Sequence, residues 1–93
     1  MNKLEECRKE VDEIDTKIIE LYEKRMSVVK DVIEYKIENG LAVLDSNRES
    51  KMLENNLKKI KNDSYKEYYE NVLKGFLTAS KDMQKDILDK NNK

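Results

Sequence analysis

Apolar residues recur at seven-residue spacing along the N-terminal part of the chain, where no Gly or Pro interrupts the segment from Leu4 to Ile37. The two rows are Leu4, Val11, Ile18, Arg25 and Val32, and Cys7, Ile14, Leu21, Val28 and Tyr35. Such spacing predicts a single amphipathic helix. Asn39 and Gly40 are predicted to end it, because both tolerate the left-handed conformation common at helix C-termini.

A second helix is predicted after a short apolar connector at residues 41–44. In the segment Ser46-Asn47-Arg48-Glu49, serine at the N-cap and glutamate three residues later match a capping box. The apolar face of this helix is supplied by Met52, Leu53, Leu57 and Ile60. Asn62-Asp63-Ser64 is predicted to end it and to cap a third helix, whose broad apolar face runs from Tyr65 to Leu88. The polar tail after Asp89 is predicted to fray.

The length of the first helix predicts a partner chain. About 34 residues span roughly 50 Å, whereas a compact chain of 93 residues has a diameter of about 30 Å. Much of the apolar stripe therefore lies beyond the reach of the other two helices. We predict an all-α fold, with residues 1–93 forming a single domain of three helices that pairs with a second copy in an intertwined homodimer.

Composition excludes several classes of function. The chain has 19 basic and 20 acidic residues, a net charge of −1, and no basic block, which argues against a nucleic-acid partner. It has no long apolar run, so no membrane span is expected, and Met1–Glu6 does not resemble a signal peptide. With no histidine and only Cys7, neither a metal site nor an intrachain disulfide is expected. The simplest location is the reducing cytosol.

Arg25 stands where the heptad spacing predicts an apolar residue. A guanidinium stays charged, so its burial requires an anion or several acceptors. It is either a snorkelling arginine at the edge of the seam or a pocket arginine that binds a carboxylate or phosphate. Lys36 follows eleven residues later, on the same face and about 16 Å away. Alone, Lys36 would be an ordinary lysine favoured by the helix dipole, but the pair suggests a ligand with separated negative groups.

Arg8 lies about 26 Å along the helix from Arg25, too far to join the same site within one chain. Two copies packed antiparallel about residue 20 would place Arg8 of one opposite residue 32 of the other, between Arg25 and Lys36. Each site would then be built from both chains. The alternative is an ordinary surface arginine.

Polar residues also interrupt the apolar faces of the other helices. Ser80 and Gln84 follow Phe76 at four-residue spacing, and they serve either as core hydrogen-bonding groups or to orient a polar ligand. Near the second helix, three residues have either a ligand-binding role or a purely structural one. The structural explanations are a capping role for Glu49, a surface position for Arg48 and a role for Asp45 in holding the loop. No nucleophile or His-based acid–base pair accompanies these residues, so an enzyme built from them works by positioning and electrostatics.

These residues, taken in order, resemble the all-helical (type II) class of chorismate mutases from Leu4 to about Leu88. The matching elements are Arg8 and Asp15 in LEECRKEVDEID, Arg25 in LYEKR, Lys36 in IEYK, Asp45, Arg48 and Glu49 in VLDSNRE, and Ser80 and Gln84 in SKDMQ. The resemblance implies an intertwined dimer without a cofactor. It also implies the Claisen rearrangement of chorismate, a small dicarboxylate, to prephenate.

The resemblance also implies roles for these residues, of which Arg8, Arg25, Lys36 and Gln84 are expected to be catalytic. Arg25 and the partner chain's Arg8 would clamp the carboxylates, and Lys36 and Gln84 would donate to the ether oxygen. Glu49, with the backbone near Asp45, would accept from the ring hydroxyl. Supporting carboxylate contacts are expected from Arg48 and Ser80, and a structural role from Asp15.

Two other functions remain open at this point. The same cations could serve an isochorismate-pyruvate lyase on the same fold. The chain could instead be a non-catalytic module for ligand sensing or helical dimerisation, although a coiled-coil adaptor does not require Arg25, Ser80 and Gln84 inside its seams. Lys81 adds a further charge beside Ser80, and it either points to solvent or alters ligand preference.

Overall fold

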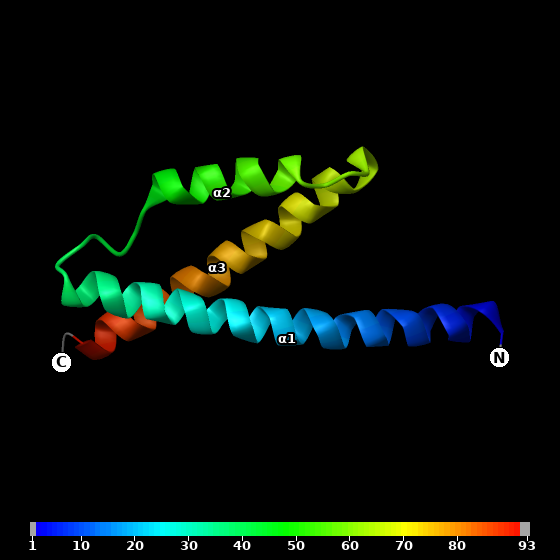
Figure 1. Ribbon diagram of the computed structural model, residues 1–93, viewed down its shortest axis with the longest axis horizontal. Helices are drawn as coiled ribbons and strands as arrows, with labels where there is room; N and C mark the ends of the chain where they lie inside the picture. Colours follow the sequence, from blue (N-terminus) through cyan, green and yellow to red (C-terminus); the bar gives the residue numbers. More distant parts are fainter. Residues whose placement is uncertain (1, 92–93) are drawn as a thin grey trace.

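The computed structural model describes residues 2–91 and contains helices joined by short connectors (Figure 1). The elements are α1 (Lys3–Glu38), α2 (Ser46–Lys58), a 3-10 turn η1 (Asp63–Tyr65) and α3 (Lys66–Asn91). No strand occurs in this part of the chain. The predicted all-α class and the long first helix are confirmed.

Helix α1 begins and ends within one residue of the predicted positions. At its start, the Asn2 side chain accepts a hydrogen bond of 2.8 Å from the backbone N–H of Glu5, which satisfies one donor of the first turn. At its end, Gly40 adopts a φ of 65°, a left-handed conformation that glycine takes without a steric penalty. The turn there redirects the chain toward α2.

Helix α2 starts differently from the prediction. Asp45, in an extended conformation, is the N-cap, and its carboxylate accepts a hydrogen bond of 3.0 Å from the backbone N–H of Arg48. The predicted Ser46 N-cap is therefore wrong by one residue. A carboxylate at this position both caps the helix and interacts favourably with its dipole. The helix ends at Lys58, so Ile60 lies beyond it.

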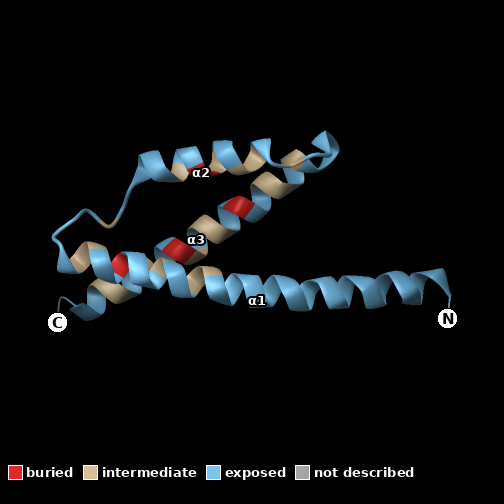
Figure 2. Cartoon of the chain, in the orientation of Figure 1, coloured by how far each residue is buried: buried red, intermediate tan, exposed pale blue. Residues whose placement is uncertain are grey.

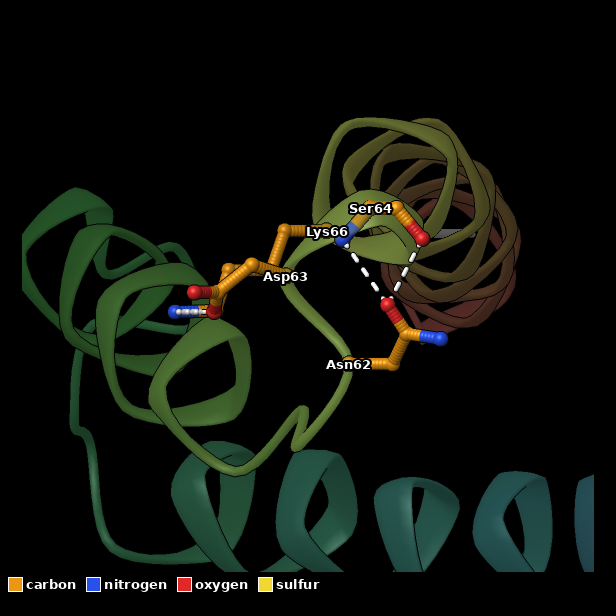
Figure 3. Close-up of polar contacts among 4 residues, drawn as sticks. All are labelled: Asn62, Asp63, Ser64 and Lys66. Carbon is orange, nitrogen blue, oxygen red and sulfur yellow. Dashed lines mark hydrogen bonds and ion pairs between the residues drawn. The ribbon is translucent and has the colours of Figure 1, made fainter.

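The turn between α2 and α3 is built on Asn62 (Figure 3). Its side-chain oxygen accepts hydrogen bonds from the backbone N–H and the hydroxyl of Ser64, at 3.0 and 2.6 Å. Lys66 pairs with Asp63 at 3.0 Å in the same turn. At the other end, α3 continues to Asn91, so the fraying predicted after Asp89 is wrong for 90–91, and residues 92–93 lie outside the described residues.

Replacing Asn62 with alanine is expected to destabilise the protein by about 1 kcal/mol, because two donors of the turn lose their acceptor. Urea denaturation at fixed protein concentration measures the change. Asn55→Ala, at an exposed position within α2, is the matched control and should not lower the midpoint. Equal denaturation midpoints for Asn62→Ala and the parent would show that the Asn62 side chain does not contribute to stability.

Helix α3 crosses α1 and packs against α2, whereas α1 and α2 stay apart within the described chain (Figure 1). The core of the described chain is small. Its buried apolar members come one from each helix: Ile33 of α1, Met52 of α2 and Leu73 of α3. Figure 2 colours all buried residues red, including the polar Ser80 of α3. Within the described chain, α3 therefore links α1 and α2, which do not contact each other directly.

The N-terminal half of α1 projects from the rest of the chain and is exposed along its length (Figure 2). The principal extents are 56, 26 and 15 Å, and the radius of gyration is 16.9 Å, against the ~12 Å typical of a compact chain of this size. Large apolar side chains of the predicted rows remain exposed, among them Leu4, Val11, Ile14, Ile18, Leu21 and Val28. None of the described helices is both long and apolar enough to cross a membrane.

Candidate active site

A cavity of about 620 Å³ lies between the C-terminal half of α1, the start of α2 and the middle of α3. This volume is within the range of small-molecule sites. Seven of the eight residues predicted to bind a ligand line it, namely Arg25, Lys36, Asp45, Arg48, Glu49, Ser80 and Gln84. They come from positions as far apart as 25 and 84, so the fold gathers residues that the sequence separates.

The lining of this cavity is both apolar and basic. Its apolar residues are Leu21, Val28, Val29, Val32, Val43, Met52 and Leu77. Its charged residues are five basic ones (Lys24, Arg25, Lys36, Arg48 and Lys81) and two acidic ones (Asp45 and Glu49). Basic residues outnumber acidic ones in this cavity, which suits a small organic anion. The apolar walls exclude water and thereby strengthen each ionic contact.

Arg25 is held in place by two neutral neighbours on α3. Its guanidinium donates a hydrogen bond of 2.9 Å to the hydroxyl of Ser80 and lies 5.4 Å from the centre of the Phe76 ring. The Phe76 ring also stacks with Tyr22, with ring centroids 6.5 Å apart. Among residues 2–91 no carboxylate lies within 4.0 Å of Arg25. Its charge therefore stays available to an anionic ligand.

Lys36 anchors the connector that follows α1. Its ammonium donates to the backbone carbonyl of Val43 at 3.3 Å, which brings residue 43 into the cavity wall. An ammonium carries three donors, so the contact leaves donors for a ligand. The lysine is half-buried and lines the same cavity as Arg25.

Helix α3 contributes two polar groups to the same cavity. Ser80 is buried, with 7% of its surface exposed. The side-chain oxygen of Gln84 is buried and has no hydrogen-bond partner in the described part of the chain. Buried polar atoms are nearly always paired, and an amide can turn to present either its oxygen or its NH₂. Gln84 is thus a polar group that lacks a partner in the free chain.

At the start of α2, the three polar residues behave differently. The Asp45 carboxylate is engaged as the N-cap. Arg48 is exposed at the rim. Glu49 does not turn back to close a capping box; it reaches α3 and forms an ion pair of 3.0 Å with Lys81. The predicted capping role of Glu49 is therefore wrong. Asp45 already occupies the N-cap, and the Glu49 carboxylate pairs with Lys81 instead.

With this geometry established, the chain can be compared with known proteins. The family of type II chorismate mutases matches residues 7–85. The chain belongs to this family. A chorismate mutase of Methanocaldococcus jannaschii is 47% identical over 49 residues, which cover 53% of this chain and 50% of that protein. The match thus spans about half of that relative's length. Membership confirms the resemblance found in the sequence.

Two residues of the family pattern lie away from the cavity. Arg8 and Asp15 are exposed on the projecting half of α1, and neither lines the cavity. The exposed position of Arg8 fits both alternatives, a residue that acts in a second chain and an ordinary surface arginine. Within one chain, therefore, the set of predicted residues is incomplete.

Some residues of this cavity carry no functional signal in the sequence. Lys24 lines the cavity beside Arg25, yet its position outside the heptad rows provides no signal. Phe76 belongs to the predicted apolar face of the third helix, and its place under Arg25 depends on how α3 crosses α1. The backbone carbonyl of Val43 carries no side-chain signal at all.

Proposed function

We propose that this chain catalyses the rearrangement of chorismate to prephenate. The observation that carries the proposal is the single cavity in which seven residues of the type II pattern meet, with basic groups set against apolar walls. Chorismate has two carboxylates, a ring and an ether oxygen, so it presents separated negative charges and apolar surface to such a cavity.

The reaction is unimolecular: the C–O bond of the ether breaks while a C–C bond forms, and no group of the protein becomes covalently attached. Catalysis requires that the folded, diaxial conformer is held and that negative charge growing on the ether oxygen is stabilised. Preorganised cations and hydrogen-bond donors accomplish both, so the described cavity needs no nucleophile or general base.

We assign the carboxylates of the substrate to the arginines. Arg25 binds one of them, because its guanidinium is positioned by Ser80 and Phe76 and free of carboxylates. Arg48 at the rim and the Ser80 hydroxyl add supporting contacts. Arg8 of the partner subunit supplies the second clamp. A guanidinium suits this task because it binds a carboxylate through two parallel hydrogen bonds.

The ether oxygen is assigned to Lys36 and Gln84. Lys36 retains donors beyond its bond to Val43. Gln84 lines the same cavity, its amide oxygen has no hydrogen-bond partner in the described residues, and the amide can turn to present its NH₂ group to a ligand. Both can therefore donate to the developing negative charge. Glu49, together with the backbone near Asp45, accepts a hydrogen bond from the ring hydroxyl.

The working unit in this proposal is an intertwined homodimer in the cytosol. The exposed apolar rows of α1 support it, since one chain leaves them in water. Two copies of α1 packed antiparallel about residue 20 cover these rows and bring each Arg8 to the other chain's cavity. The reducing cytosol is compatible with the free thiol of Cys7.

Phe76→Leu is expected to raise the KM for chorismate about threefold, because a cation–π contact is worth roughly 0.5–1 kcal/mol at a partly exposed site. Leucine keeps the apolar contact but removes the ring beneath Arg25. Steady-state kinetics measure the effect, and Phe76→Tyr, which keeps the ring, is the control. A parental KM in the leucine variant would contradict the proposed support of Arg25.

The proposal is tested by incubating the purified protein with chorismate and, separately, with isochorismate. Formation of prephenate from chorismate is the expected result. Release of pyruvate from isochorismate without prephenate formation from chorismate would assign the cavity to the lyase reaction instead. A folded protein that is inactive on both substrates would leave the chain as a non-catalytic member of the family.

A further inference from the structure

One ion pair in the cavity wall joins two helices. The Lys81 ammonium on α3 lies 3.0 Å from the Glu49 carboxylate on α2, and both residues line the cavity. The other four ion pairs in residues 2–91 join positions three or four apart in sequence. The Lys81–Glu49 pair is therefore the one ion pair of the described chain that depends on the tertiary fold.

The Glu49 side chain is also the best shielded of the paired carboxylates. It is 24% exposed, whereas the carboxylates of the other four pairs are 44 to 87% exposed. Shielding from water strengthens the attraction between its charge and any cation nearby. The position of this carboxylate thus affects which cations of the cavity remain free.

Without Lys81, Glu49 would have other cations within the same cavity. Arg48 precedes it directly, and Arg25 and Lys36 line the cavity with it. A glutamate has several rotatable bonds, so its carboxylate could turn toward one of these groups and neutralise it. An anionic ligand would then compete with Glu49 for that cation. Lys81 engages one carboxylate oxygen on the α3 side and leaves the other available as an acceptor.

We propose that Lys81 is a positioning residue that holds the Glu49 carboxylate away from the cations that bind the substrate. This inference rests on the proposed function, since it assumes that the cavity takes a dicarboxylate. Lys81 acts through Glu49: it keeps the arginines free for the carboxylates of the substrate and directs the second oxygen of Glu49 toward the ring hydroxyl.

Lys81→Met tests this role, because methionine retains much of the apolar side chain and removes the charge. The expected result is a KM for chorismate about tenfold higher, since the ligand-competent arrangement of the cavity falls to roughly a tenth of the molecules. The kcat should stay within about threefold. Lys81→Arg, which keeps the charge, should restore the KM. The matched control is Lys74→Met on the same helix, where the lysine pairs with Glu70 at 3.9 Å outside the cavity.

A double-substitution cycle with Glu49→Gln separates positioning from other roles. Glutamine carries no charge and cannot neutralise an arginine, so Lys81→Met should change the KM little when Glu49→Gln is already present. Two results would overturn the inference. One is a multiplicative loss in the double variant, which would mean that Lys81 contacts the substrate by itself. The other is a lower melting temperature of Lys81→Met with parental KM, which would mean a structural role alone.

The same cycle measured by calorimetry with prephenate keeps this inference distinct from the proposed function. A parent protein that binds prephenate but does not convert chorismate would remove the proposed activity, and the affinities of the variants for prephenate would still test Lys81. In that case, the expected result is an affinity about tenfold lower for Lys81→Met alone. A parent that neither converts chorismate nor binds prephenate would overturn both.

Discussion

Replacing Arg25 with alanine is expected to lower kcat/KM for chorismate by about 100-fold or more, the usual cost of removing a preorganised charged donor. The guanidinium lies in the cavity between Ser80 and Phe76, and no carboxylate of the described chain pairs with it. Its removal therefore takes an unpaired positive charge out of the cavity. Steady-state measurement of prephenate formation gives the change directly.

Two comparisons make this experiment decisive. Lys30→Ala removes a cation from the exposed side of the same helix, where the lysine lies 4.0 Å from Glu34, and it should leave kcat/KM unchanged because such surface pairs contribute little. Circular dichroism and the oligomeric state of Arg25→Ala must match the parent. A folded Arg25→Ala variant that retains parental kcat/KM would remove Arg25 from the site.

The second large effect is expected at Arg8, which lies outside its own chain's cavity. Arg8→Ala should also lower kcat/KM by about 100-fold, although about 26 Å of helix separates Arg8 from Arg25. The reason is that a second copy, packed antiparallel, supplies Arg8 to each site. Within its own chain Arg8 does not line the cavity, so a loss of this size would require a partner chain that supplies Arg8.

Mixing the two inactive variants tests this arrangement further. When Arg8→Ala and Arg25→Ala chains are refolded together, about half of the dimers are mixed and one of their two sites carries both arginines, so about a quarter of the parental activity should return. Arg25→Ala refolded with itself is the control and stays inactive. If the activity of the mixture is only the average of the activities of the two variants, Arg8 does not act across the interface. A parent protein that is monomeric by analytical ultracentrifugation would lead to the same conclusion.

The sequence determined the helices because their signals are local. The heptad rows from Leu4 to Tyr35 and the Asn39-Gly40 stop predicted α1 to within one residue at each end. Polar residues in apolar rows, above all Arg25, Ser80 and Gln84, predict a polar pocket, and all three line the cavity. Local signals also misled: Ser46 and Glu49 match a capping box, but Asp45 caps the helix. Two adjacent residues with similar capping ability cannot be ranked from spacing alone.

The tertiary structure decided which of these residues meet and what partners they have. The ion pair between Glu49 and Lys81 and the ring of Phe76 under Arg25 depend on the angle at which α3 crosses the other helices. That angle follows from the packing of whole surfaces, including Ile33 and Leu73, and no short segment encodes it. Helical periodicity states which face a side chain occupies, whereas contact between faces is a property of the folded chain.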